Sequence, residues 1–178
     1  MGRKLALLRG INVGGRVLPM AELRDLCSKL GWTEVQTYIQ SGNVIFESAD
    51  EPAALEASLE AALAERFGFN VPVMVRTPAQ WAVYPAGNPF LEAARDEPKW
   101  LMLLVPKRPP AADAVELLKA RATMGEKVGR TGDGLWIWFA GGVAGSKLSP
   151  LLIDKLVDSP ATSRNHRTVM KLKEMLEA

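Results

Sequence analysis

The sequence predicts an α+β fold in two halves, because short apolar runs and amphipathic segments follow one another in a similar order twice along the chain. Glycine and proline separate these segments, as they commonly do between short strands and helices. The chain has 178 residues, of which 48% are hydrophobic and 24% charged, a composition typical of globular proteins. A chain of this length can bury a sizeable core.

The composition excludes several classes of protein. A single cysteine cannot form an intrachain disulfide, and a single histidine cannot supply a His-based metal cage, so we expect no metal or other cofactor. The four apolar residues before Arg9 are too few for a signal peptide or a membrane span. We therefore expect a cytoplasmic protein. The net charge of +2 neither requires nor excludes a nucleic-acid partner.

The first half begins with an apolar strand at residues 4–8, which runs into a glycine-rich loop. Pro19 suits the first turn of a helix, because its fixed φ is helical and its missing N–H costs nothing there. Apolar residues then recur at spacings of three and four as far as Leu30, and Gly31 is the expected stop.

Two strands, a helix and a further strand complete this half. β-branched and aromatic residues at 35–39 and 44–46 flank a polar turn, which indicates a hairpin. A row of leucines four residues apart predicts a helix at 52–67, and alternating valines predict a strand at 71–75. Pro72 indicates that this strand lies at a sheet edge or that Pro72 stands at its beginning. The order β-α-β-β-α-β is that of a ferredoxin-like fold.

Residues 78–97 are predicted to connect the two halves through short helical turns. Thr77 and Gln80 have the spacing of a capping box, with Pro78 at the first helical position. Tyr84-Pro85 is expected to end this helix.

The second half repeats the order β-α-β-β and then continues with two helices. Its predicted elements are a strand at 100–105, a helix at 115–122, strands at 126–130 and 135–139, a helix at 150–157 and a last helix from about Ser163. We therefore expect two tandem ferredoxin-like halves, residues 1–77 and 98–178, packed together and followed by an extra C-terminal helix.

Four stretches of the sequence resemble an uncharacterised bacterial family, the domain of unknown function 1697. They are LLRGINVGG at 7–15, PMAEL at 19–23, YIQSGNV at 38–44, and ATSRN at 161–165 followed by TV at 168–169 and KL at 171–172. The resemblance implies a cytoplasmic α+β protein with two ferredoxin-like halves, and it implies no established activity. His166 stands where the family is expected to carry Trp more often, so no aromatic role is carried over to that position.

The glycine-rich loop is the first candidate site. Gly10 and Gly15 have the spacing of a phosphate-binding P-loop, but Arg16-Val17 replaces the required lysine and hydroxyl residue. The predicted helix also begins too late to point its N-terminus at a phosphate held there. The pattern is therefore not that of an ATPase.

A weaker anion site remains possible at this loop. Backbone N–H groups near Gly14 and Gly15, with Arg9, Asn12 and Arg16 close in sequence, would form an anion-binding concavity. The alternative is that the glycines serve only to turn the chain and that the arginine side chains are solvated.

The hairpin turn is the second candidate. Glycine and Asn43 suit the turn itself because both tolerate positive φ. Gln40 and Ser41 are not required for the turn, so their amide and hydroxyl groups are candidates for contacts with a ligand. The alternative is a purely structural turn.

The predicted start of the last helix is the third candidate. Ser163 suits the N-cap, and Asn165 is expected to bond back in the manner of a capping box, but capping does not explain Arg164. His166 and Ser163 would share a helix face, yet no carboxylate close in sequence orients them as a catalytic pair.

Three apolar or aromatic residues have structural explanations that compete with functional ones. Cys27 lies on the apolar face of the first helix and is expected in the core rather than as a nucleophile. Trp136 and Trp138 share one face of a strand, where they would stack a nucleic-acid base or fill the core. We expect both rings to be mostly buried.

The sequence thus predicts a small binding module for an anionic, phosphate-bearing ligand, with an enzyme of unknown reaction or a nucleic-acid-binding protein as alternatives. The three motifs contain amides, hydroxyls and arginines but no carboxylate, which favours binding over catalysis. The predicted ligand-binding residues, expected to converge on one cleft, are Arg9, Asn12, Gly14, Gly15, Gln40, Ser41, Asn43, Ser163, Arg164 and Asn165.

Overall fold

The computed structural model describes all 178 residues, which form two compact units. The first unit contains Met1–Trp81 and Leu172–Ala178, and the second contains Ala82–Lys171. The domain boundaries expected from the sequence, at residues 77 and 98, stay a prediction.

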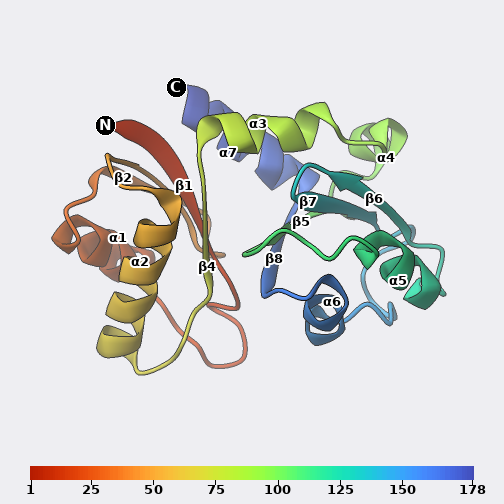
Figure 1. The fold of residues 1–178 in the computed structure, drawn as a ribbon, viewed down its shortest axis with the longest axis horizontal. Helices are drawn as coiled ribbons and strands as arrows, with labels where there is room; N and C mark the ends of the chain where they lie inside the picture. The colour runs from red at the N-terminus through yellow and green to blue at the C-terminus, as the bar shows by residue number, and fades with distance from the viewer. The chain divides into compact units, whose positions relative to one another are not determined.

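The first unit contains one antiparallel sheet and two main helices (Figure 1). Its elements are, in order, β1 (Gly2–Leu8), α1 (Met20–Lys29), β2 (Thr33–Tyr38), β3 (Asn43–Ser48), α2 (Pro52–Phe67) and β4 (Val73–Arg76). The strands lie in the order β2-β3-β1-β4, so β1 is central and β4 is at an edge. The edge position expected from Pro72 is confirmed.

Alternation along the strands builds the core of this unit. Ala6 and Leu8 of β1 pack with Phe46 of β3 against α1 and α2, which lie on one face of the sheet. Trp32 stacks on Phe46, with ring centroids 3.8 Å apart. Residues 5–8 are all fully buried, so both faces of β1 are covered, as its continuous apolar run predicts.

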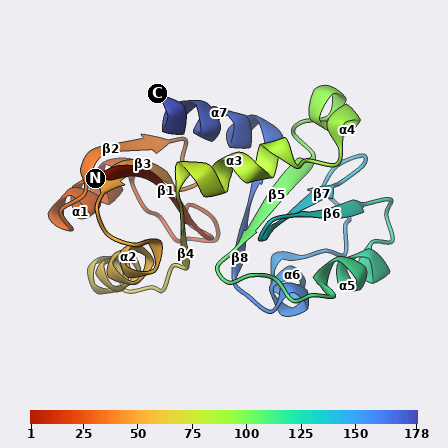
Figure 2. The same ribbon diagram turned by 45° about the horizontal axis from the view of Figure 1, so that its top comes forward.

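The second unit contains another antiparallel sheet, with the order β6-β7-β5-β8. Helices α5 and α6 lie on one face of this sheet (Figure 2), where their apolar residues share a core with β5 and β7. The remaining elements are α3 (Pro78–Ala86), α4 (Leu91–Asp96), β5 (Leu101–Pro106), α5 (Ala114–Arg121), β6 (Lys127–Thr131), β7 (Gly134–Trp138), α6 (Pro150–Val157), β8 (Ala161–Asn165) and α7 (His166–Glu177).

The predicted capping box at the start of α3 is confirmed. The Thr77 N–H donates to Gln80 Oε1 at 2.9 Å, and the Gln80 N–H donates to Thr77 Oγ1 at 3.2 Å. The predicted end of this helix at Tyr84-Pro85 is wrong, because α3 continues to Ala86 with Pro85 inside it.

The prediction of a helix from Ser163 is also wrong. Residues Ala161–Asn165 form β8, which pairs antiparallel with β5 and places Arg164 opposite Leu103. Helix α7 begins only at His166. The strand carries no apolar alternation that a sequence pattern would reveal, and its pairing with the distant β5 decides its conformation. The chain is therefore a mixed α+β protein with two four-stranded antiparallel sheets and seven helices.

Candidate functional site

The glycine-rich loop between β1 and α1 alternates in backbone conformation. φ is positive at Gly10, Asn12 and Gly14, with values of 65°, 55° and 57°, and also at Gly15, at 84°, where the alternation ends. The residues between them, Ile11 and Val13, do not have positive φ. Alternation of left-handed and right-handed residues turns successive N–H groups toward one side, and such backbone concavities bind anions.

The tip of this loop presents backbone donors to solvent. Val13, Gly14 and Gly15 are exposed, and their N–H groups donate no hydrogen bond within the chain. The loop is closed beneath them, since the Asn12 N–H donates to the Arg16 carbonyl at 2.7 Å and the Arg16 N–H donates to the Val13 carbonyl at 3.2 Å. The donors are therefore held on a defined turn.

Asn12 joins the loop to the β2–β3 hairpin. Its Nδ2 donates to the Gln40 carbonyl at 2.6 Å and to the Leu18 carbonyl at 3.1 Å, while its Oδ1 accepts from the Leu18 N–H at 2.8 Å. Gln40 is 28 residues away in sequence. Two of the predicted site segments are thus brought together, and the Asn12 amide is engaged in holding them.

Gly42 brings the hairpin turn against the same loop. Its carbonyl accepts from the Leu8 N–H at 2.8 Å, and its φ is 78°. A Cβ at this position would stand 2.7 Å from Ile11 Cδ1 and 2.8 Å from Leu8 Cβ. Only glycine satisfies both this close approach and the left-handed backbone.

Asn43 and Ser41 stabilise the turn from within. Asn43 is fully buried, and its Nδ2 donates to the Tyr38 carbonyl at 2.9 Å and to Ser41 Oγ at 3.0 Å. Gln40 is exposed at the end of the hairpin. Asn43 therefore supports the turn, whereas Gln40 has its side chain in solvent beside the loop.

Two arginines accompany the loop. Arg9 is partly buried, and its backbone N–H donates to the Pro72 carbonyl at 3.0 Å. Arg16 is exposed, and its guanidinium carbon lies 5.9 Å from the Phe69 ring centroid. Its Nη1 also lies 3.9 Å from where a Cβ on Gly10 would stand. The Arg16 guanidinium thus lies beside Gly10.

Ser163, Arg164 and Asn165 lie in strand β8, whereas the sequence predicts them at the N-terminus of a helix. Arg164 is 6% exposed, and its Nη1 donates to Thr162 Oγ1 at 2.7 Å and to the Ser163 carbonyl at 2.8 Å. Burial lowers the pKa of Arg164 to about 10. Asn165 is the N-cap of α7, because its Oδ1 accepts from the Thr168 N–H at 2.9 Å. Their convergence with the first-unit residues stays a prediction.

The two most reactive residue types offer no catalytic centre. Burial raises the pKa of the Cys27 thiol to about 12, and Cys27 lies in the core as predicted. His166 is partly buried, with its ring 5.8 Å from that of Trp136. Burial lowers its pKa, so the ring is neutral at pH 7, and no hydrogen bond joins it to Ser163.

The two tryptophans of β7 differ in exposure. Trp136 is fully buried, as expected, and its Nε1 donates to the Tyr84 carbonyl at 3.0 Å. Trp138 is only partly buried and lines a surface hollow together with Phe90 and Lys127. No motif in the sequence points to this hollow, because its residues come from separate segments.

Metal-ligating clusters and membrane-spanning helices are both absent from the structure. No group of three or more His, Cys, Asp and Glu side chains is placed to hold a metal ion. None of the helices is both long enough and apolar enough to cross a membrane.

Comparison with known proteins gives a family and a related structure. A family described as protein of unknown function (DUF1697) matches residues 1–136, which is more than half of the chain. A solved structure, that of the conserved bacterial protein SP0830 from Streptococcus pneumoniae, is 26% identical over 98% of each chain, with a TM-score of 0.77. No curated protein matches the chain.

Proposed function

We propose that this chain, which belongs to the DUF1697 family of unknown function, is a small cytoplasmic binding module for an anionic, phosphate-bearing ligand. The observation that carries the proposal is the row of exposed N–H groups at Val13, Gly14 and Gly15, which donate no hydrogen bond within the chain. An anion supplies acceptors for such donors, and hydrogen bonds to a charged group contribute about 1.5–3 kcal/mol each.

The fold proposed for each unit is ferredoxin-like. In support, the element order of the first unit is β-α-β-β-α-β, and its strand order read from the edge is β4-β1-β3-β2. The second sheet has the equivalent order β8-β5-β7-β6. The fold does not select a function, since such units serve many.

Charge favours an anion over other small ligands. Arg16 brings a guanidinium beside the loop without an ion-pair partner, and Arg9 begins the loop. No Asp or Glu occurs at residues 9–17 or 40–43, so no like charge opposes an anion from these segments. The absence of side chains at Gly14 and Gly15 lets the ligand approach the backbone closely.

The same inventory argues against catalysis at this site. General acid–base catalysis needs a group that titrates near the working pH, and residues 9–17 and 40–43 contain no Asp, Glu, His or Cys. Of the ten predicted residues, Arg9, Gly14, Gly15 and Gln40 are the proposed contacts, and Asn12, Ser41 and Asn43 hold the turn that presents them. Ser163, Arg164 and Asn165 belong to the second unit, and their role in ligand binding stays a prediction.

The test is calorimetric titration of the protein with inorganic phosphate and pyrophosphate at constant ionic strength. Arg16→Ala is expected to weaken binding about tenfold and to leave the melting temperature nearly unchanged, because the side chain is exposed. Arg66→Ala is the control for surface charge. Arg66 is also exposed and lies 5.4 Å from the Phe67 ring, but its Nη2 is paired with Glu22 Oε2 at 3.0 Å.

Two outcomes would contradict the proposal. One is the absence of binding of either anion at millimolar concentration. The other is an equal loss of affinity in Arg16→Ala and Arg66→Ala, because that result would assign binding to general surface charge.

A further inference from the structure

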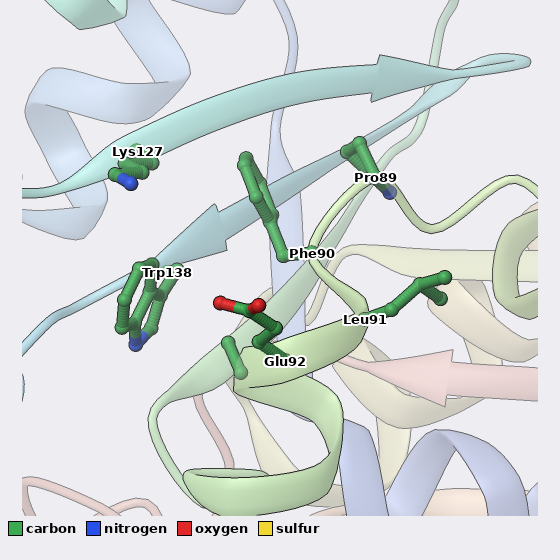
Figure 3. A pocket seen from close by; sticks show the side chains of 7 residues that line it. Pro89, Phe90, Leu91, Glu92, Lys127 and Trp138 are labelled. Atoms are coloured by element: carbon green, nitrogen blue, oxygen red, sulfur yellow. The ribbon is translucent and has the colours of Figure 1, made fainter.

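A second, chemically different hollow lies in the second unit. It encloses about 410 Å³ and is open to solvent, which is within the range of small-molecule sites. Figure 3 shows four side chains around the space: Phe90 and Trp138 supply aromatic rings, Glu92 a carboxylate, and Lys127 an ammonium group.

The aromatic walls are fixed by contacts outside the hollow. The Trp138 Nε1 donates to Glu97 Oε2 at 2.8 Å, which sets the orientation of the indole ring. The Phe90 N–H donates to Asn88 Oδ1 at 3.0 Å, and a Cβ on Gly129 would stand 2.6 Å from Pro89 Cγ. The loop that carries Phe90 therefore rests directly on β6, and the wall is formed before a ligand arrives.

The two charged groups at the hollow form no ion pair with each other or with another residue. Neither Glu92 nor Lys127 has an ion-pair partner. Arg95, the nearest basic residue on α4, binds Asp96 through two hydrogen bonds of 2.7 and 2.8 Å. Lys127 Nζ lies 5.1 Å from the Trp138 ring centroid. A carboxylate and an ammonium group thus line one space beside two aromatic rings, with the ammonium over the Trp138 ring.

We propose that this hollow binds a guanine nucleotide. Aromatic rings at Phe90 and Trp138 suit a planar base, which stacks or packs edge-to-face on them. The Lys127 ammonium suits the phosphate, since lysine acts as a compact positive charge. The Glu92 carboxylate has acceptors only, so it requires N–H donors on the edge of the base.

The carboxylate selects guanine among the bases. The Watson–Crick edge of guanine places the N1–H and N2–H donors side by side, and these match the two oxygens of Glu92. Adenine has an acceptor at N1 beside its amino group, so a carboxylate would meet one donor and one lone pair. A good two-point pairing of this kind discriminates between bases by about tenfold or more.

This site is independent of the proposed anion site. All its lining residues belong to the second unit, whereas the anion site is built on the loop between β1 and α1. Guanosine lacks phosphate, so we expect it to bind at the hollow and not at the anion site. Arg16→Ala is therefore expected to leave guanosine affinity unchanged, and the two proposals fail or succeed separately.

The experiment is titration of the full chain with guanosine 5′-monophosphate, adenosine 5′-monophosphate and guanosine. We expect the guanine nucleotide to bind about tenfold more tightly than the adenine nucleotide. Glu92→Gln is expected to remove this preference, because the glutamine amide keeps one acceptor oxygen and places its NH2 group against the second donor of guanine. Both Glu92 and Lys127 are exposed, so these substitutions are not expected to disturb the fold.

A matched pair of lysines tests the phosphate contact. Lys127→Gln is expected to weaken binding of the guanine nucleotide severalfold and to leave guanosine binding unchanged. Lys99→Gln removes the same charge from a lysine that lies 4.4 Å from another tryptophan ring, that of Trp100, outside the hollow, and is expected to have no effect.

The proposal is overturned by any of three results. They are equal affinity for the guanine and adenine nucleotides, equal loss of affinity in Lys127→Gln and Lys99→Gln, or no binding of either nucleotide at millimolar concentration. Binding of a zwitterionic amino acid in place of the nucleotides, lost in Glu92→Gln, would also overturn it and assign the hollow to a different ligand.

Discussion

The loops that follow the central strands of the two sheets occupy equivalent positions and differ in chemistry. After β1 the loop is rich in glycine, and the N–H groups of Val13, Gly14 and Gly15 donate to nothing within the chain. After β5 the loop contains Pro109 and Pro110, which have no N–H. At equivalent positions, glycine therefore leaves backbone N–H donors for a ligand, whereas proline removes them.

Three other N–H donors of the loop after β5 are used by the protein. The Lys107 N–H donates to the Pro160 carbonyl at 2.8 Å, and the Arg108 N–H donates to Ser159 Oγ at 2.9 Å. The Ala111 N–H donates to the Val157 carbonyl at 3.1 Å. This loop uses these three donors to join β5 to α6 and the segment after it, and leaves only the N–H groups of Ala112 and Asp113, directly before α5, without a hydrogen bond within the chain.

The two hairpin turns also differ in what they contact. The β2–β3 turn is attached to the glycine-rich loop through Asn12 and Gly42. The β6–β7 turn is attached instead to helix α3, where the Tyr84 hydroxyl donates to Asp133 Oδ1 at 2.5 Å. The β2–β3 turn therefore contacts a candidate site, whereas the β6–β7 turn packs against helix α3.

The reaction rate of the Cys27 thiol measures how often the core of the first half opens. Burial raises its thiol pKa from 9.0 to about 12, so at any pH below 9 the thiolate population is about a thousandfold smaller than that of an ordinary cysteine. We expect the native protein to react at least that much more slowly with a disulfide reagent at pH 8 than the protein in denaturant. Rapid reaction of the native protein would show that the first half opens readily.

Gly42→Ala tests whether the hairpin and the glycine-rich loop form one structure. The added Cβ would clash with Ile11 and Leu8 and would occupy a left-handed backbone, so we expect a loss of about 3 kcal/mol in urea denaturation. Gly31→Ala is the control, because its φ is 84° but nothing lies within 4 Å of the new Cβ. Equal losses in the two variants would mean that the turn and the loop are not packed together.

Asn12→Ala removes the side-chain hydrogen bond from the loop to the hairpin at Gln40 and two hydrogen bonds within the loop to Leu18. Three bonds are lost, and we expect a decrease of about 2 kcal/mol in the free energy of unfolding, together with weaker phosphate binding. Ser159→Ala, which breaks the side-chain bond to the loop after β5, is expected to cost about 1 kcal/mol and to leave phosphate binding intact. Loss of phosphate binding in Ser159→Ala would remove the contrast between the loops.

The burial of His166 makes the stability of the protein depend on pH. Burial lowers its folded-state pKa below 6.5, so as the pH falls through 6.5 the unfolded chain takes up the proton first and stability decreases. The decrease is complete once the pH lies below the folded-state pKa. We expect the melting temperature of His166→Gln to fall less between pH 7.5 and 5.5 than that of the wild type, by on the order of 1–3 °C. Identical pH dependence would place His166 in an environment like water.

Local patterns account for most of the elements and for part of the candidate site. The capping box of Thr77 and Gln80, the hairpin at 40–43 and the buried position of Cys27 follow from residues close together in sequence. The spacing of its glycines and the neighbouring arginines predict the glycine-rich loop as a candidate site, and Gly10, Asn12 and Gly14 adopt positive φ there.

What required the folded chain were the pairings between distant segments. Strand β8 has a polar sequence and exists because β5, about 60 residues earlier, offers it a ladder of backbone partners. The bond from Asn12 to Gln40 and the placing of Phe90, Glu92, Lys127 and Trp138 around one hollow likewise join separate segments. Propensity, capping and periodicity act over a few residues and are therefore legible in sequence, whereas strand pairing and the shape of a hollow depend on which segments the packed core brings together.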